Sequence, residues 1–182
     1  EALVRLADTV VDKSPAWIRE HCPDQDAAFA YGFTGCPICS ARWGTWGGAD
    51  CSFDRPGTVE CRNGHILPNA TYRDPGTGYV GGDGRIHYFV ASYNAWVVET
   101  YQKWCQWLSF AYTVTGEDKY AVTCAVVLDA LAEIYPSCDE GSWDYPSNPP
   151  SGRLNRPWYQ VARVLVLLVD YYDRIYNTPA LE

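Results

Sequence analysis

Four cysteine and histidine side chains in two close pairs constrain the fold of this chain more than any other feature. The first pair is Cys36-Pro-Ile-Cys39, and the second, 22 residues later, is Cys61-Arg-Asn-Gly-His65. A C-x2-C spacing presents two thiolates to one ion, and three cysteines with one histidine form a closed tetrahedral set suited to structural zinc. Because a closed set leaves no open position for a substrate, we expect a structural metal site.

The residues around these pairs support a metal site but leave alternatives open. Gly35 and Gly64 lie where tight ligand loops need a permissive backbone. Cys51 is an alternative to His65 as the fourth ligand. The other interpretations are four unligated residues or a Cys36–Cys39 redox pair. A thioredoxin-like pair would be accompanied by a βαβ pattern, which the neighbouring sequence lacks.

The composition is that of a globular protein and argues against nucleic acid or membrane partners. The 182 residues suit one domain, with 47% hydrophobic and 20% charged residues. A net charge of −8 opposes binding to nucleic acid, and an anionic sugar would need a local basic patch. The most apolar run, Val164–Val169, is far shorter than the roughly 20 residues of a membrane span.

The amino terminus and the cysteine count leave the compartment undecided. The chain begins at Glu1 and contains no methionine, so we expect a processed or trimmed start and no visible export signal. Eight cysteines permit disulfides, although a chain of this length does not need them. Cys105 and Cys124 fall on apolar helical faces and are predicted to be core residues. The pair His21-Cys22 is interpreted as a helix end in preference to a second metal site.

The sequence pattern divides the chain into three regions. Residues 1–31 are predicted to form N-terminal helices, and residues 32–91 a zinc-ribbon-like insert rich in glycine and turns. Residues 92–182 are predicted to hold a helical hairpin and a buried helix. The fold class is therefore mainly α with a small β insert.

Apolar periodicity and turn signals give the expected elements more closely. Helices are predicted at 2–13, 15–21, 94–114, 117–135 and 157–177, and short β pieces at 58–61 and 86–90. Gly116 predicts a tight turn, so the third and fourth helices form an antiparallel hairpin. The last helix is apolar on nearly every face, which indicates burial between neighbouring helices and a protein that continues beyond this sequence.

Polar and aromatic side chains form two candidate groups for a sugar-binding cleft, because such clefts combine aromatic planes with polar groups. They are Tyr79, Asp83, Arg85, His87, Tyr88, Tyr93, Asn94 and Trp96, followed later by Arg153, Asn155, Trp158 and Tyr159. The predicted substrate contacts among them are Arg85, His87, Tyr88, Tyr93, Asn94, Trp96, Trp158 and Tyr159. The alternatives are that the aromatic residues form core and that Ser92 or Asn94 only caps a helix. The sequence holds no nucleophile elbow, phosphate-binding glycine loop or H-E-x-x-H motif.

Several short motifs follow one another along the chain. After the CPxC knuckle comes Cys61-Arg-Asn-Gly-His65-Ile-Leu-Pro-Asn. Then follow Asp74-Pro-Gly-Thr-Gly-Tyr79, Tyr88-Phe-Val, Tyr93-Asn-Ala-Trp96 and Ala111-Tyr-Thr-Val-Thr-Gly-Glu-Asp-Lys-Tyr120. In this order the motifs resemble the N-terminal catalytic region of heparinase II/III-like and oligo-alginate lyase-like proteins, over roughly residues 30–177.

The resemblance implies part of an (α/α) toroid of antiparallel helix hairpins, followed by a β-sandwich domain. It further implies β-elimination at a uronic acid of an acidic polysaccharide, in the periplasm or outside the cell. The family's catalytic Asn-His pair and tyrosine would lie beyond residue 182, and no Asn-His dipeptide occurs in this chain. The fragment alone is thus expected to be inactive, to need the remainder of its own chain, and to contribute substrate contacts through Tyr93, Asn94 and Trp96.

Two other functions remain open from the sequence. One is a non-catalytic carbohydrate-binding domain, and the other is a zinc-knuckle module that binds protein. Glycan binding without turnover would favour the first, and a closed zinc site with no adjacent groove would favour the second.

Overall fold

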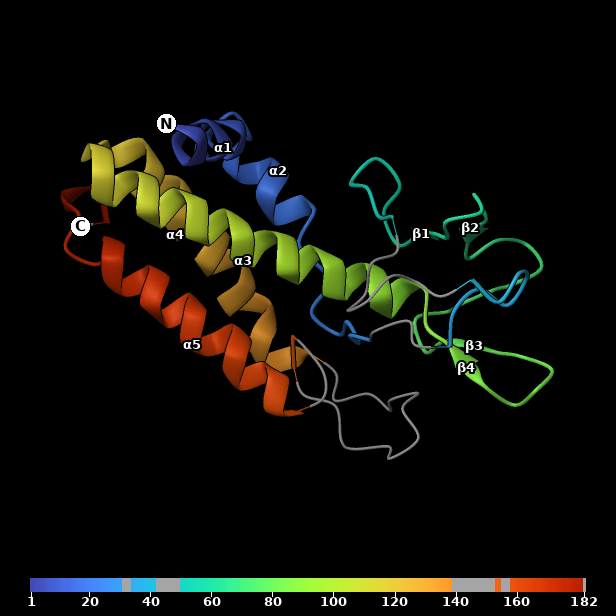
Figure 1. The fold of residues 1–182 in the computed structure, drawn as a ribbon. Helices are drawn as coiled ribbons and strands as arrows, with labels where there is room; N and C mark the ends of the chain where they lie inside the picture. The colour runs from blue at the N-terminus through green and yellow to red at the C-terminus, as the bar shows by residue number, and fades with distance from the viewer. Residues whose placement is uncertain (31–33, 42–49, 139–152, 155–157, 182) are drawn as a thin grey trace.

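The computed structural model describes residues 1–30, 34–41, 50–138, 153–154 and 158–181. This part of the chain is mainly helical, with two small antiparallel sheets. The helices gather at one end of the molecule, and the sheets lie at the other (Figure 1). The helices are α1 (Ala2–Val11), α2 (Pro15–Glu20), α3 (Val90–Thr115), α4 (Asp118–Ile134) and α5 (Trp158–Ile175), with short 3-10 turns η1 (Tyr135–Ser137) and η2 (Pro179–Leu181).

Helices α3 and α4 form the predicted antiparallel hairpin. Gly116 ends α3 in the left-handed conformation at φ 71°, and its N–H donates to the carbonyl of Tyr112 over 2.8 Å. Leu108 and Ala111 of α3 are fully buried, as is Val127 of α4. Helices α1, α4 and α5 all pack against α3, which is therefore the central element of the helical layer.

The start of α3 differs from the prediction because its cap comes from a distant loop. The helix begins at Val90, so Ser92 and Asn94 lie inside it and neither is its N-cap. One carboxylate oxygen of Asp74 accepts the N–H groups of Phe89 and Val90 over 2.8 and 3.0 Å. A carboxylate at this position suits the positive end of the helix dipole, so Asp74 joins the loops to the helix.

Helix α5 is buried on one face, which corrects the expectation of burial on nearly every face. Val164 and Ile175 face the core and are 2% and 0% exposed. Val166 and Val169 point away from it and are 66% and 65% exposed. The described part of the protein therefore presents an apolar helix surface to its surroundings.

One stretch in the described part of the chain, Asp118–Ser137, has the length and composition of a membrane-crossing helix, with 20 residues and a mean hydropathy of 1.2. The sequence prediction considered only continuous apolar runs and missed it. A core helix meets the same criteria, and 39% of this stretch is buried inside the structure. Asp129 and Glu133 on α4 form ion pairs with Arg19 of α2.

The sheets are hairpins of very short strands. β1 (Val59–Glu60) pairs with β2 (Ile66–Leu67), and β3 (Tyr79–Val80) pairs with β4 (Ile86–His87). β1 and β4 lie within the predicted pieces at 58–61 and 86–90, whereas their partner strands were not predicted. The hydrophobic core runs without a break from α3 into this region through Val59 and Leu67.

Candidate metal centre

The first two candidate ligands lie on a tight turn that backbone hydrogen bonds close. The N–H of Cys36 donates to the carbonyl of Ala41, and the N–H of Ser40 donates to the carbonyl of Cys36, each over 2.8 Å. Gly35 enters the turn at φ 74°, a left-handed conformation in which glycine has no steric penalty. The turn places Cys36 and Cys39 on one side of the loop.

The other two candidate ligands lie on the loop of the β1–β2 hairpin. Cys61 follows β1 and His65 precedes β2, and the N–H of Cys61 donates to the carbonyl of His65 over 3.0 Å. Gly64 adopts φ 80° and its N–H donates to the carbonyl of Cys61 over 2.8 Å. The pairing of Glu60 with Ile66 closes this loop. The hairpin thus brings two ligands together that are four residues apart.

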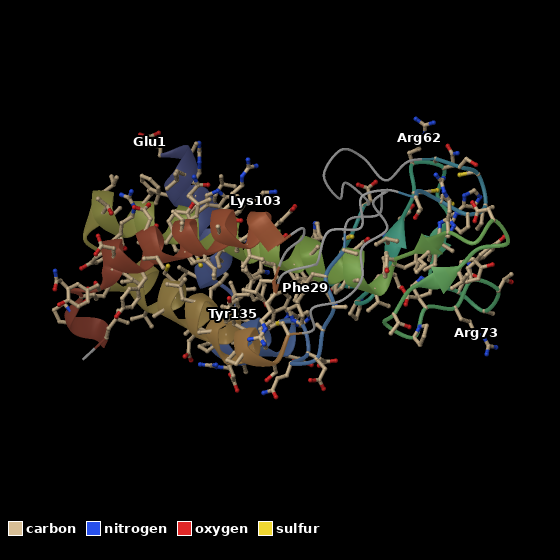
Figure 2. All side chains as sticks on the ribbon, turned by 90° about the horizontal axis from the view of Figure 1, so that it is seen from below. Glu1, Phe29, Arg62, Arg73, Lys103 and Tyr135 are labelled. Carbon is tan, nitrogen blue, oxygen red and sulfur yellow. The ribbon has the colours of Figure 1, made fainter. Side chains whose placement is uncertain are left out.

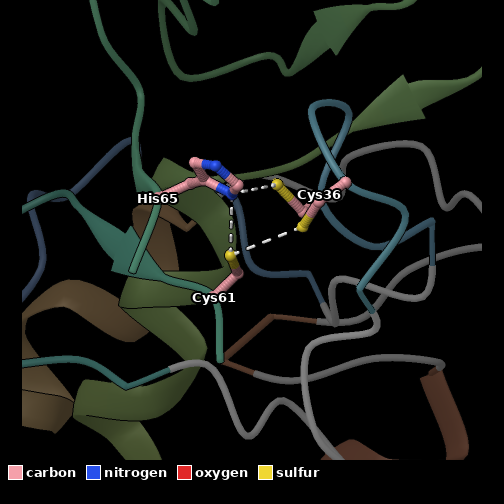
Figure 3. Close-up of side chains that lie close together, drawn as sticks. Cys36, Cys61 and His65 are labelled. Atoms are coloured by element: carbon pink, nitrogen blue, oxygen red, sulfur yellow. Dashed lines mark hydrogen bonds between the residues drawn. The ribbon is translucent and has the colours of Figure 1, made fainter. Parts of the chain in front are cut away.

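These two loops bring the four predicted ligands into one cluster. The Sγ atoms of Cys36, Cys39 and Cys61 and a ring nitrogen of His65 all lie within 4.8 Å of one another. Sγ of Cys39 and Sγ of Cys61 are 3.8 Å apart, and Nδ1 of His65 lies 3.7 Å from Sγ of Cys36 and 3.3 Å from Sγ of Cys61. Figure 3 shows the side chains of Cys36, Cys61 and His65 converging.

The spacing within the cluster agrees with tetrahedral coordination of one ion. Two sulfurs bound to one zinc at about 2.3 Å stand about 3.8 Å apart, and a sulfur and a nitrogen about 3.6 Å apart. A disulfide would instead hold two sulfurs about 2.0 Å apart. The four residues therefore have the composition, spacing and partial burial to hold a metal ion.

The surroundings give the thiols unequal pKa values. Backbone hydrogen bonding from Ala41, aided by the amide of Asn63 at 3.3 Å, lowers the pKa of Cys39 to about 6. Burial raises the pKa of Cys36 to about 11, against the opposing hydrogen bonds of the Ile38 and Cys39 backbone. N–H groups aimed at sulfur are the partners that a metal-bound thiolate needs.

The remaining cysteines are not part of this cluster. Cys51, the alternative fourth ligand, packs against the hydrophobic core, and burial raises its pKa to about 12. Cys105 and Cys124 are fully buried in the helical layer, which confirms that they are core residues. His21 ends α2, where its Nδ1 bonds the carbonyl of Trp17 over 2.8 Å, so the helix-end interpretation holds for it.

Two of the predicted substrate-binding residues line a cavity beside the metal cluster. Arg85 and His87 take part in lining a polar cavity of about 570 Å³, which Cys36 also lines. We name this space the hairpin cavity, because most of its lining comes from the β3–β4 hairpin. Tyr79, a member of the first polar and aromatic group, and Tyr72, which that group lacks, contribute rings 5.3 Å apart in an edge-to-face arrangement.

The other predicted substrate-binding residues lie elsewhere. Tyr93 and Asn94 line a second cavity of about 790 Å³, where the Asn94 amide donates to the carbonyl of Ala28 over 3.1 Å. Tyr88 is buried, and Trp96 packs against Phe53 with ring centroids 4.8 Å apart. Trp158 and Tyr159 open α5, and their side chains lie outside the described part of the structure.

The region that holds the cluster is close to electrically balanced. Residues 50–89 contain four arginines and five acidic residues, so this region carries one of the chain's eight net negative charges. Arg62 and Arg73 point outward at the loop-rich end, away from Glu1 (Figure 2). One of the five acids, Asp74, already accepts four backbone N–H groups. An anionic ligand therefore meets far less repulsion here than the net charge of the chain suggests.

No family model, curated protein or solved structure matches this chain. Function must therefore be argued from the metal cluster and the cavity beside it.

Proposed function

We propose that Cys36, Cys39, Cys61 and His65 bind one structural zinc ion. The observation that carries this proposal is the convergence of all four ligand atoms within 4.8 Å, from two loops that share no strand. Three thiolates and one imidazole form a soft ligand set that favours zinc over magnesium or calcium. Four protein ligands complete a tetrahedron, so the ion supplies structure and leaves no position for a substrate.

The role of the zinc ion is to tie together loops that have little other support. The four strands of this region are only two residues long. Isolated hairpins of this kind are marginal in water. Zinc binding would join residues 34–41 to the β1–β2 hairpin, and its free energy would contribute directly to folding of these loops.

We further propose that the hairpin cavity binds a uronic-acid unit of an acidic polysaccharide. Arg85 is exposed at this cavity and forms no ion pair with the described residues, so its guanidinium is available for a carboxylate. The rings of Tyr72 and Tyr79 offer surfaces for a sugar ring. Asp83 also lines the cavity, and its Oδ1 accepts the N–H of Arg85 over 3.0 Å. Its charge opposes an anionic ligand in part.

Taken together, we propose that this chain is a region of a polysaccharide lyase that acts by β-elimination. In that reaction a cation neutralises the uronate carboxylate, a base removes the neighbouring proton, and an acid protonates the leaving oxygen. Arg85 would supply the neutralising charge. The exposed apolar face of α5, with Val166 and Val169, supports a further layer of helices over it, as in an (α/α) toroid.

The zinc proposal is tested by replacing the metal with cobalt. A tetrahedral Co²⁺ ion with three thiolate ligands gives strong visible bands and a thiolate charge-transfer band. We expect one cobalt per chain with both signatures, unchanged in Cys51→Ser and altered in His65→Ala. An octahedral cobalt spectrum, or loss of binding in Cys51→Ser, would contradict the proposed ligand set.

The glycan proposal is tested with a trimer of mannuronic acid and with maltotriose as the neutral control. We expect binding of the acidic trimer alone, weakened about tenfold by Arg85→Gln because a charge-assisted hydrogen bond is lost. Arg62→Gln is the matched control, since Arg62 is exposed but does not line the cavity. Release of an unsaturated uronate by a protein containing this region would support the lyase, whereas binding without turnover would favour a carbohydrate-binding domain.

A further inference from the structure

His87 is a buried polar residue whose ring is held in one tautomer. Its side chain is 5% exposed, and its Nδ1 lies 2.9 Å from the carbonyl oxygen of Gly35. A carbonyl oxygen only accepts hydrogen bonds, so Nδ1 must carry the proton. In the neutral ring, Nε2 then has a free lone pair.

The free nitrogen of His87 lies beside Gly81, and both residues line the hairpin cavity. His87 lines this cavity, and Nε2 makes no hydrogen bond with any residue that the structure describes. A methyl group on Gly81 would stand 3.0 Å from Nε2 and 2.9 Å from Oδ1 of Asp83. Glycine at position 81 therefore keeps the space in front of Nε2 open. A hydrogen-bond acceptor at this point suits a hydroxyl group of a sugar.

The hydrogen bond that sets this tautomer comes from the metal-binding loop. Gly35 directly precedes Cys36, the first candidate ligand, and Thr34 on the same loop donates to the carbonyl of Ile86 over 3.1 Å. The loop therefore contacts both residues of β4, the carbonyl of Ile86 and the ring of His87. Any change in the loop that moves the Gly35 carbonyl removes the partner of Nδ1.

We propose that the metal site and the hairpin cavity are coupled through the hydrogen bond between Gly35 and His87. With the metal bound, the Gly35 carbonyl holds His87 as the Nδ1–H tautomer, and Nε2 accepts a hydroxyl of a sugar ligand. Without the metal, the loop releases the ring and the acceptor is lost. This coupling rests on the proposed function, because it requires both the zinc site and a sugar ligand in the cavity.

Histidine side-chain NMR, which reports the tautomer of each of the three rings, tests the coupling directly. In the zinc-bound chain we expect Nδ1–H for His87 and Nε2–H for His65, whose Nδ1 faces the metal cluster. After chelation we expect His87 to change to a mixture of tautomers. His21 is the internal control, because its Nδ1 bonds the carbonyl of Trp17 in α2 and not a carbonyl of the metal-binding loop, and it should remain Nδ1–H.

Ligand binding tests the second half of the coupling, with the mannuronate trimer as the probe. Gly81→Ala should weaken binding about tenfold, because its methyl group covers Nε2, and removal of zinc should weaken it at least as much. The same methyl group also crowds Asp83, so Asp83→Ala is measured beside it and should not weaken binding, since the charge of Asp83 opposes an anionic ligand. Gly82→Ala is the matched control, because a methyl group there meets nothing within 4 Å, and it should change binding less than about twofold. Zinc content checks that the variants fold.

The outcomes separate failure of the coupling from failure of the proposed function. A chain that binds zinc but keeps His87 as Nδ1–H after chelation overturns the coupling alone. Equal affinities of the Gly81→Ala and Gly82→Ala variants for the trimer would overturn the role of Nε2 as the acceptor. A chain that binds neither zinc nor the trimer overturns the proposed function, and the coupling with it.

Discussion

Two regions of this molecule are held together in different ways. The helical region, α1 to α5, buries apolar side chains along continuous helix faces. One such face belongs to α3 and carries Val97, Leu108 and Ala111. The loop region, residues 34–41 and 50–89, has four strands of two residues each and depends on turns, a capping carboxylate and the metal cluster. Under the proposed function, the chain combines a helical core that needs no ion with a loop region whose order would depend on one.

Beside the core that continues from α3 through Val59 and Leu67, a small number of contacts join the two regions. Phe53 of the loop region packs against Trp17, Trp96 and Trp104, with ring centroids 5.1, 4.8 and 5.5 Å away. Asp74 connects the loop before β3 to the start of α3. We therefore expect damage to one region to reach the other mainly through these residues.

Removal of the metal should produce the largest difference between the regions. Structural zinc sites contribute about 10–16 kcal/mol of binding free energy at neutral pH, and that energy is linked to folding. In zinc-free protein or in Cys61→Ser, hydrogen exchange should become at least about 100-fold faster in residues 50–89 and remain nearly unchanged in α3 and α4.

The matched control for this prediction is Cys51→Ser, which removes a thiol outside the cluster. Its exchange pattern should match that of the wild type. Uniform exchange changes in both regions after chelation would show that the metal supports the whole fold.

A cavity in the helical core should instead destabilise the helical region and leave the metal cluster intact. Leu108 is fully buried in α3, so Leu108→Ala should lower the free energy of unfolding by about 3 kcal/mol. Val114→Ala on the same helix is the control, because Val114 is 76% exposed, and its cost should stay below about 0.5 kcal/mol. Urea unfolding measures both. A loss of zinc from natively folded Leu108→Ala would refute the separation between the regions.

Loss of the cap between the regions should have an intermediate effect that both regions share. Asp74 accepts the N–H groups of Gly76, Gly78, Phe89 and Val90 over 2.8–3.0 Å. Asp74→Ala should cost about 2 kcal/mol and accelerate hydrogen exchange at the start of α3 as well as in the loop before β3. Asp83→Ala, which removes an acceptor for one backbone N–H, should cost less. Equal costs would argue against a joining role for Asp74.

The exposed ion pairs between α2 and α4 should matter least. Arg19 pairs with Asp129 and Glu133, and all three side chains are more than 40% exposed. Arg19→Met should therefore cost less than about 1 kcal/mol, and less still at high salt. Thermal unfolding of Arg19→Met measures this cost. The control is Arg5→Met, which replaces an exposed arginine of α1. A cost comparable to that of Leu108→Ala would contradict this ranking.

The sequence predicted the helical region better than the loop region, and the reasons are physical. Helix faces repeat every three to four residues, so the α3–α4 hairpin and the turn at Gly116 could be located by pattern. The first residue of α3, Val90, could not be located, because its cap is Asp74, sixteen residues earlier in the chain. Strands of two residues are too short to show alternation, so β2 and β3 were missed.

The metal cluster was predictable because ligands three or four residues apart on one tight turn lie close together whatever the rest of the fold does. Cys36, Cys39, Cys61 and His65 meet as expected, since each pair lies on one tight turn. The proposed sugar contacts were harder, because the chain turns from β4 into α3 between His87 and Tyr93. That turn sends neighbouring residues in the sequence to two different cavities. Tyr72 reaches the hairpin cavity through tertiary folding alone, and no local pattern marked it.

The most direct test of the central claim is the metal content of the intact chain by native mass spectrometry, with free thiols counted before and after chelation. The account predicts one zinc ion per chain, three further thiols reactive after chelation, and loss of the metal in the Cys61→Ser variant. A chain without metal, or one whose mass shows a disulfide among Cys36, Cys39 and Cys61, would contradict it.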